Sequence, residues 1–231
     1  MLNVSNLHVA YGQSEVLHGL DFMVAPGEIV AIMGRNGMGK TTLLKCVMGL
    51  LPAASGEIRY DGEDLRKRTA DKRAGLGIGY VPQGREIFPQ LSVEENLRLG
   101  LFVRKSGQAE ALERVYATFP VLKQMARRRG GDLSGGQQQQ LAIGRALIYD
   151  PRLLILDEPC EGIQPNIVHD IGDLILRLNR ETGLTVLLVE QKLPFARRVA
   201  SEFRILDKGR LVSSGPIADL SDDLVKHHLT V

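Results

Sequence analysis

A glycine-rich segment, residues 34–41, constrains the fold of this chain more than any other part of its sequence. It reads Gly-Arg-Asn-Gly-Met-Gly-Lys-Thr, it follows the apolar run 29–33, and residues 42–48 after it favour a helix. This order predicts a buried strand, a tight loop and a helix, which together form a P-loop that binds nucleotide phosphates. A glycine-rich turn before a core helix is the alternative, and the flanking strand and helix patterns favour the P-loop.

Each residue type in this segment suits one part of a triphosphate. Glycines let the backbone turn its N–H groups inward, and a helix that begins near Lys40 adds the positive end of its dipole. Lys40 supplies a mobile cation for the β- and γ-phosphates, and the Thr41 hydroxyl is suited to hold Mg²⁺. The residues expected to bind the nucleotide here are Gly34, Asn36, Gly37, Gly39, Lys40, Thr41 and Thr42.

Two adjacent acids end a second buried strand. Residues 153–156 are continuously apolar, as in a strand covered on both faces, and Asp157 and Glu158 follow them directly. Sheets of α/β proteins place ligand groups at the carboxyl ends of such strands, so Asp157 is expected to hold the Mg²⁺ that bridges the phosphates. Glu158 is the candidate general base that accepts a proton from the attacking water. The alternative is an acid pair at a helix start beside Pro159.

A third motif, Ser134-Gly135-Gly136-Gln137, has the spacing of a capping box at a helix start. Two interpretations are open. The motif can be an N-cap and turn that binds no ligand, or its glycines can expose backbone N–H groups to an anion. Because the P-loop already covers one side of the triphosphate, a second anion site indicates a nucleotide shared between two subunits. All four residues are therefore candidate nucleotide contacts.

The remaining sequence predicts a single domain, residues 1–231. Alternating or apolar runs predict strands at 2–11, 16–24, 28–33, 57–60, 78–81, 153–156 and 184–189, and a hairpin over 203–212. Helical periodicity predicts helices over 93–103, 110–128, 134–148 and 167–180, with a break at 105–108. We therefore expect a mostly parallel α/β core, an antiparallel β layer near the N-terminus and a helical subdomain inserted at roughly residues 91–131.

Composition restricts the partners and the compartment. Lys and Arg number 29 against 27 Asp and Glu, a formal net charge of +2 that is too balanced for a nucleic-acid-binding surface. The two cysteines, Cys46 and Cys160, have no metal spacing and favour reduced thiols. The N-terminus lacks the pattern of a signal peptide, and no apolar run approaches the roughly 18 residues of a membrane span. The chain is therefore expected to be cytosolic and to reach a membrane only by docking to a protein there.

Together, residues 34–41, Gln83, Leu133-Ser134-Gly135-Gly136-Gln137 and residues 153–159 resemble an ATP-binding-cassette (ABC) ATPase over essentially the whole chain. The resemblance implies ATP and Mg²⁺ as cofactors and two cassettes packed head to tail, as a homodimer or a heterodimer. Each ATP would lie between the P-loop of one cassette and Ser134, Gly135 and Gly136 of the other. It also implies that Tyr11 stacks on adenine, and that Gln83 contacts Mg²⁺ or the attacking water and senses a transmembrane partner.

Two positions depart from the common pattern of that family. Glu190 is followed by Gln191 where most cassettes carry a histidine that contacts the γ-phosphate, and Gln164 stands where aspartate is usual. Gln191 can hydrogen-bond a phosphate oxygen but cannot carry charge, so it is a candidate catalytic residue that does not titrate. The P-loop lysine and both strand-end acids are present, which favours an active ATPase.

These departures, with residues 84–89 and 161–165, are similar to the second ATP-binding subunit of bacterial importers for branched-chain amino acids and for urea. Residues 193–196 and 228–231 favour the urea member, and a branched-chain amino-acid importer is the alternative. The resemblance implies two integral-membrane permease subunits as partners, a position at the cytoplasmic face of the inner membrane, and a periplasmic solute-binding protein that acts indirectly. A soluble ABC ATPase of DNA repair, translation or iron–sulfur assembly is a further alternative, disfavoured by a short insert without a cysteine pair and by a single cassette.

Overall fold

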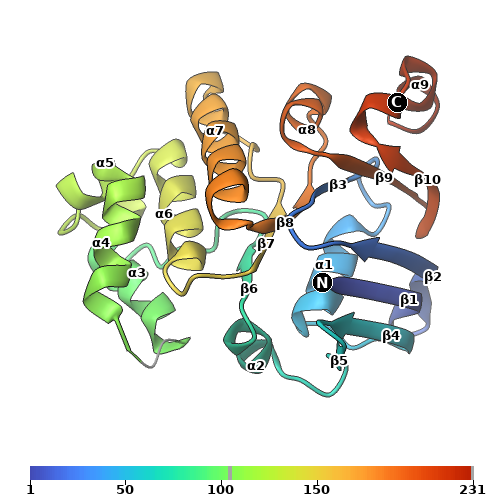
Figure 1. The fold of residues 1–231 in the computed structure, drawn as a ribbon, viewed down its shortest axis with the longest axis horizontal. Helices are drawn as coiled ribbons and strands as arrows, with labels where there is room; N and C mark the ends of the chain where they lie inside the picture. The colour runs from blue at the N-terminus through green and yellow to red at the C-terminus, as the bar shows by residue number, and fades with distance from the viewer. Residues whose placement is uncertain (104–105, 230–231) are drawn as a thin grey trace.

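A six-stranded sheet carries the glycine loop and the acid pair. The structure is a computed structural model that describes residues 1–103 and 106–229 (Figure 1). The strand order is β10-β9-β3-β8-β7-β6, and all neighbours are parallel except β9 and β10. This arrangement brings the carboxyl ends of the parallel strands to one edge, where α/β proteins bind ligands. The strands are β3 (Ile29–Met33), β6 (Ile78–Val81), β7 (Leu153–Asp157), β8 (Thr185–Val189), β9 (Glu202–Asp207) and β10 (Arg210–Pro216).

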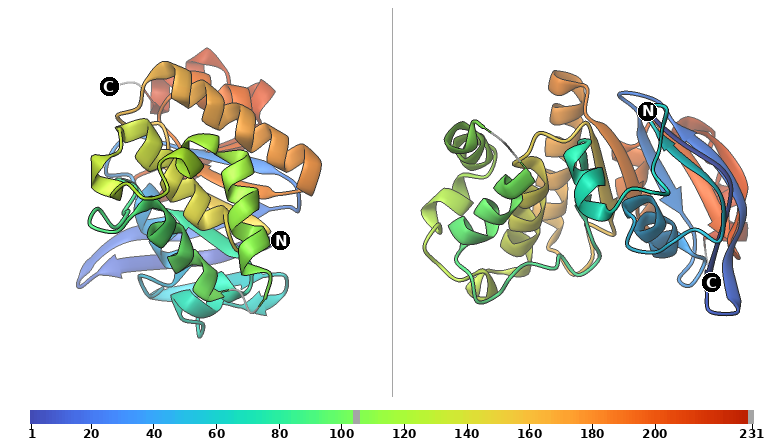
Figure 2. Two further views of the ribbon diagram at one scale, coloured as in Figure 1. Left: turned by 90° about the vertical axis from the view of Figure 1, so that its left-hand side faces the viewer. Right: turned by 90° about the horizontal axis from the view of Figure 1, so that it is seen from below.

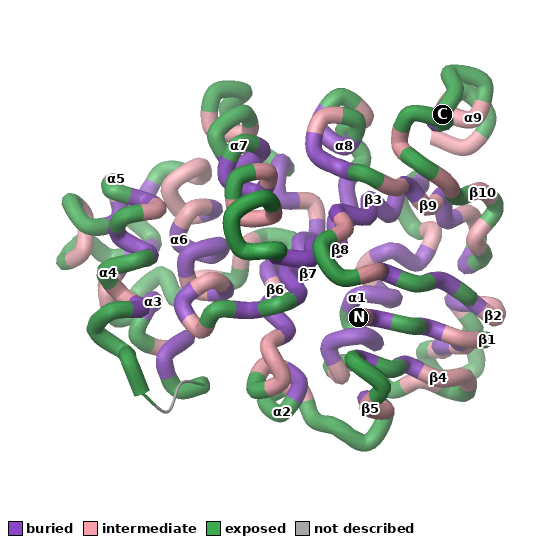
Figure 3. The backbone as a smooth tube through the Cα atoms, viewed as in Figure 1, coloured by how far each residue is buried: buried purple, intermediate pink, exposed green. Residues whose placement is uncertain are grey.

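The two faces of this sheet belong to different hydrophobic cores. Along β7, Leu153 and Ile155 pack in one core, whereas Leu154 and Leu156 pack in the other. The same alternation holds along β3 and β8, and every residue of these three strands is buried (Figure 3). Burial on both faces explains why the sequence shows continuous apolar runs at these strands rather than alternation.

An antiparallel sheet covers one of these cores. It has the order β2-β1-β4-β5 and consists of β1 (Leu2–Tyr11), β2 (Ser14–Val24), β4 (Ser55–Tyr60) and β5 (Glu63–Asp64). Helix α1 (Lys40–Met48) contacts β1, β2 and β7, so it lies between the two sheets (Figure 1, Figure 2). The predicted antiparallel layer near the N-terminus is therefore confirmed, and it holds the P-loop helix from the side opposite the parallel sheet.

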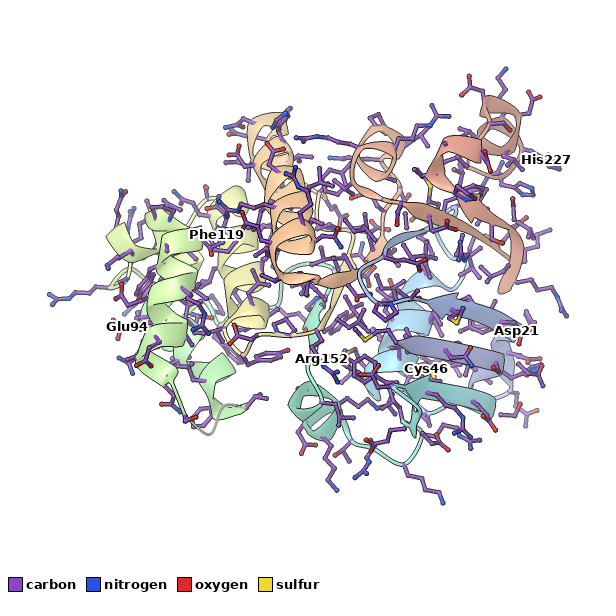
Figure 4. All side chains as sticks on the ribbon, in the orientation of Figure 1. Asp21, Cys46, Glu94, Phe119, Arg152 and His227 are labelled. Atoms are coloured by element: carbon purple, nitrogen blue, oxygen red, sulfur yellow. The ribbon has the colours of Figure 1, made fainter. Side chains whose placement is uncertain are left out.

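A lobe of helices, at the left of Figure 1, packs on the other core. Its helices are α3 (Val93–Gly100), η1 (Leu101–Val103), α4 (Gln108–Thr118), α5 (Pro120–Gln124) and α6 (Gly135–Leu147). The predicted single helix over 110–128 is wrong, because α4 stops before Phe119 and α5 starts at Pro120 (Figure 4). Proline has no N–H to continue α4, and its fixed φ suits the first turn of a new helix. The predicted break at 105–108 is partly wrong as well, since Gln108 already belongs to α4; residue 105 lies outside the described residues.

Several helix ends carry capping signals, and the capping box predicted at Ser134 is confirmed. Capping boxes are present at Ser92 and Ser134, and helix α7 (Pro165–Thr182) ends at Gly183 in the left-handed conformation, with φ 70°. Cys46 and Cys160 are free and buried. None of the described helices is long and apolar enough to cross a membrane. The remaining elements are α2 (Ala70–Gly75), η2 (Gly130–Asp132), α7 (Pro165–Thr182), α8 (Leu193–Val199), η3 (Ile217–Asp219) and α9 (Asp222–His228).

Candidate nucleotide-binding site

The loop between β3 and α1 has the backbone that its glycines predict. Gly34, Gly37 and Gly39 have φ angles of 153°, 78° and 101°, in a region that other residues rarely adopt. A Cβ atom on Gly34 would lie 2.3 Å from the carbonyl oxygen of Leu206, and one on Gly39 would lie 2.6 Å from the Leu17 side chain. A side chain at Gly34 would therefore collide with the backbone of β9, and one at Gly39 would need both a strained φ and a shift of the Leu17 side chain. The loop keeps a concave backbone suited to an anion.

Lys40, the first residue of α1, folds back over this loop. Its side chain is 6% exposed, and Nζ donates hydrogen bonds to the carbonyl oxygens of Gly34 (2.7 Å) and Arg35 (2.8 Å). Nζ also lies 4.0 Å from Oε1 of Glu158. Burial lowers the pKa of Lys40, and three nearby carboxylates act to raise it. The ammonium group is thus held inside the loop by carbonyl oxygens that phosphate oxygens can replace.

Asp157, the last residue of β7, is a buried carboxyl group without a hydrogen bond. It is 1% exposed, and neither oxygen has a hydrogen-bond partner among the described residues. Burial raises the pKa of Asp157 from 3.8 to about 6. The nearby Thr41 hydroxyl acts to lower that pKa, but its position does not meet the geometry of a hydrogen bond. A buried carboxylate without a partner is costly, and a cation beside it removes that cost.

The donor set around Asp157 fits Mg²⁺. The described residues contain no cluster of three or more His, Cys, Asp or Glu side chains that could hold a metal ion alone. Mg²⁺ bound with nucleotides is held in proteins by one or two oxygen ligands, and phosphates and water complete its coordination. One carboxylate and one hydroxyl, from Asp157 and Thr41, are therefore sufficient at this place.

Glu158, Gln191 and Asn36 form a connected group at the carboxyl edge of the sheet. Glu158 follows β7 with φ 48°, and its N–H donates to the carbonyl oxygen of Val189 at the end of β8 (2.8 Å). Nε2 of Gln191 donates to Oδ1 of Asn36 (2.7 Å) and to Oε1 of Glu158. Three predicted site residues, from the P-loop and from the segments that follow β7 and β8, are therefore joined beside Lys40.

A cavity in front of the P-loop is lined by half of the predicted site residues. Gln83, which follows β6, reaches it from the edge of the sheet, and its Nε2 donates to Oε2 of Glu161 (3.1 Å). Val16 of β2 also lines this cavity, a contact that no residue pattern predicted. The lining residues are Val16, Asn36, Gly37, Gly39, Lys40, Thr41, Thr42, Gln83 and Glu158.

Two predicted groups of nucleotide contacts lie away from this cavity. Residues 134–137 start α6: Oγ of Ser134 accepts the N–H of Gln137 (3.4 Å), and the Ser134 N–H donates to Oε1 of Gln137 (2.9 Å). Tyr11, at the end of β1, is 49% exposed. Within the described part of the chain, neither group lines the P-loop cavity. The roles of these residues toward ATP stay predictions.

Comparison with known proteins places this arrangement in a family. The model of the ABC transporter family matches residues 17–161, which include the P-loop, the Ser134 motif and the acid pair. The chain belongs to the ABC transporter family. The branched-chain amino acid transport ATP-binding protein BraG of Pseudomonas aeruginosa is 43% identical, and the match covers 92% of this chain and 91% of that protein. The probable branched-chain amino acid transport protein LivF of Archaeoglobus fulgidus is 34% identical, with 95% and 94% covered.

Solved structures of ABC proteins agree with this assignment. The ATP-binding cassette MJ0796, in a dimeric post-hydrolysis state bound to ADP and Pi, has a TM-score of 0.86 and 26% identity. That match covers 94% of this chain and 99% of the cassette. The predicted fold class and the resemblance to ABC ATPases are therefore confirmed, and the chain is an enzyme that binds and hydrolyses ATP.

The ABC site contains one buried acid that sequence reasoning missed. Glu190 is 2% exposed, and its Oε1 accepts the backbone N–H groups of Gln191 (2.8 Å) and Lys192 (2.9 Å). Glu190 therefore fixes the backbone that carries Gln191. An acid directly after a buried apolar strand was the signal that identified Asp157, and the same signal was present at Glu190.

Proposed function

We propose that this chain hydrolyses ATP to drive a bacterial importer of branched-chain amino acids. The observation that carries the proposal is the 43% identity to BraG over nine-tenths of both chains, and the match to LivF supports it. The urea importer that residues 193–196 and 228–231 favoured has no support from these relatives. Residues 230 and 231 of that stretch also lie outside the described residues.

The P-loop residues are proposed to hold the triphosphate. Backbone N–H groups of the loop and the ammonium group of Lys40 bind its oxygens, and Tyr11 stacks on adenine from the exposed end of β1. Thr41, Asp157 and Gln83 are proposed to hold Mg²⁺. The bound ion would neutralise negative charge on the β- and γ-phosphates. The unpartnered oxygens of Asp157 support this assignment.

Glu158 is proposed to accept the proton of the attacking water. Its side chain lines the cavity, lies 4.0 Å from Nζ of Lys40 and accepts a hydrogen bond from Gln191. The hydrogen bond from the Gln191 amide orients the carboxylate that would accept the proton. Gln191 also bonds to Asn36, so it links the base to the phosphate-binding loop.

A second cassette is proposed to complete the site. The signature residues Ser134, Gly135, Gly136 and Gln137 lie away from the cavity of their own chain, as expected if they contact the nucleotide of a partner. That partner is a copy of this chain or a related cassette. Two integral-membrane permease subunits would hold the pair at the cytoplasmic face of the inner membrane, and a periplasmic solute-binding protein would select the solute.

The proposal is tested by solute uptake in cells that lack this gene. We expect uptake of labelled leucine to be lost and labelled urea uptake to be unchanged. The wild-type chain should restore leucine uptake, whereas Glu158→Gln should bind ATP but restore neither uptake nor ATP turnover. Glu181→Gln, at the exposed end of α7, is the matched control and should behave as wild type.

Three results would contradict parts of the proposal. Loss of urea uptake alone would identify a urea importer. Unchanged uptake of both solutes would remove the transport assignment and leave the ATPase. Normal turnover by Glu158→Gln would remove Glu158 from the reaction.

A further inference from the structure

Arg85 connects three parts of the ABC site that are far apart in the sequence. It follows Gln83 in the loop after β6 and has φ 72°. Its Nη1 donates to Oε1 of Gln138 in the first turns of α6 (3.3 Å), and its Nη2 donates to the carbonyl oxygen of Glu161 in the loop after β7 (3.2 Å). One guanidinium group thus bonds to the helix that begins with the signature and to the loop that follows Glu158.

Two glycines provide the space that this guanidinium group occupies. A Cβ atom on Gly135 would lie 3.3 Å from Nη2 of Arg85, and one on Gly162 would lie 3.6 Å from the same atom. Gly135 belongs to the first turn of α6, and Gly162 belongs to the loop after β7. The planar group therefore packs between the two backbones in addition to bonding with both segments.

The loop that carries Arg85 is itself fixed on both sides. Nη2 of Arg145, from α6, donates to the carbonyl oxygen of Glu86 (2.7 Å), and its guanidinium carbon lies 5.3 Å from the centre of the Phe88 ring. On the other side, Gln83 bonds to the carboxylate of Glu161. The loop that carries Arg85 is therefore tied to the same two segments that Arg85 bonds, to α6 through Arg145 and to the loop after β7 through Gln83.

We propose that Arg85 is a positioning residue that sets the place of the signature helix relative to the loop after the catalytic Glu158. The inference rests on the proposed function, because it assumes that both segments act on bound ATP. A displacement of about 1 Å at such groups can lower a reaction rate by roughly a hundredfold. Arg85 touches neither phosphate nor water in this account and acts through Gln138 and Glu161.

Lysine cannot replace Arg85 in this role. The two bonds leave different nitrogens of one rigid plane and reach acceptors on separate segments. A lysine ammonium is a single point on a flexible stem, so it can satisfy one acceptor without fixing the other. Arg85→Lys is therefore expected to resemble Arg85→Ala, whereas a role limited to positive charge would let lysine restore function.

The test combines amide hydrogen exchange with ATPase kinetics on the purified chain. In Arg85→Ala we expect exchange of residues 134–138 and 160–163 to rise about tenfold, the factor expected for one lost charge-assisted hydrogen bond. Exchange of residues 40–48 and the affinity for ATP should keep their wild-type values, and kcat should fall about tenfold or more. Arg59→Ala is the matched control, because Arg59 is an exposed arginine on β4 that bonds to Glu57.

Several outcomes would overturn the inference. These are wild-type exchange in either segment of Arg85→Ala, a fall in kcat with unchanged exchange, or full rescue by Arg85→Lys. If Arg85→Ala unfolds, Gln138→Ala serves instead: it should raise exchange in 134–138 and leave 160–163 unchanged, and a uniform rise would contradict the role of Arg85. Amide hydrogen exchange of the purified chain does not depend on the transported solute. Unchanged leucine uptake in cells that lack the gene would therefore leave these expectations in place.

Discussion

Replacement of Asp157 by asparagine is expected to stabilise the nucleotide-free chain, because it removes a buried charge. The carboxyl is 1% exposed, without a hydrogen bond among the described residues, and burial raises its pKa from 3.8 to about 6. At pH 7.5 it is ionised in both the folded and the unfolded chain. A rise in pKa of that size then lowers the free energy of unfolding by about 3 kcal/mol.

The sign of the pH dependence follows from the same pKa values. Well below pH 3.8 the carboxyl is protonated in both states, so its burial costs no charge transfer. As pH rises toward about 6, the unfolded chain loses this proton before the folded chain does, and stability falls. About half of the loss has occurred at pH 5, so Asp157→Asn should gain about half as much there as at pH 7.5, where the gain is about 3 kcal/mol.

Urea unfolding with a chelator and without nucleotide measures this gain at both pH values. Asp170→Asn is the matched control, because Asp170 is exposed on α7 and should change stability by less than about 0.5 kcal/mol. A variant of Asp157 that is less stable than wild type at pH 7.5 would refute the reasoning. An equal gain at both pH values would assign the effect to packing rather than to charge.

Three further variants test the loop and its neighbours. Lys40→Ala should weaken ATP binding about a hundredfold by calorimetry, because Lys40 is the buried cation of the loop; a similar loss in Lys45→Ala, an exposed lysine of α1, would contradict this. Gly39→Ala should lower stability by about 1–3 kcal/mol in thermal unfolding, since φ is 101° and a Cβ would meet Leu17, whereas Gly75→Ala, with open space around it, should have little effect. Gln191→His should add an inflection near about pH 6.5 to the pH–rate profile, and an unchanged profile would place residue 191 outside the reaction.

The buried strands and the P-loop could be predicted because their sequences admit few other structures. Residues 153–156 are apolar and residue 157 is an acid. They form a strand that is buried on both faces and ends in a ligand group, as this pattern predicts. The split at Phe119 and Pro120 was missed because helical periodicity continues across it, although a proline inside a helical pattern is itself a stop signal. Helix α8 starts with Leu193 and Pro194 and is only seven residues long, too short for a periodic signal.

The site was less predictable than the fold, because its contacts join distant segments. Residue types and spacing identified Lys40 and Asp157, but they contain no information on the carbonyl partners of the lysine or the lack of partners of the acid. Gln83 and Glu161 are 78 positions apart, and Arg85 and Gln138 are 53 apart. Gln83 meets Glu161 only once the loops after β6 and β7 lie side by side, and Arg85 meets Gln138 only once α6 lies against the loop after β6.

The charges around Lys40 explain why a divalent cation belongs to the proposed reaction. Asp157, Glu158 and Glu190 all lie close enough to Lys40 to act on its pKa, so three acidic side chains surround this lysine. A nucleoside triphosphate alone brings further negative charge, which these carboxylates repel. Mg²⁺ held at Asp157 would turn that repulsion into attraction, so the acids should select the Mg²⁺ complex over the free nucleotide. The carboxylate of Asp157 therefore lowers the stability of the nucleotide-free chain and also selects the Mg²⁺ complex. Asp157→Asn should gain stability and lose the preference for MgATP over free ATP.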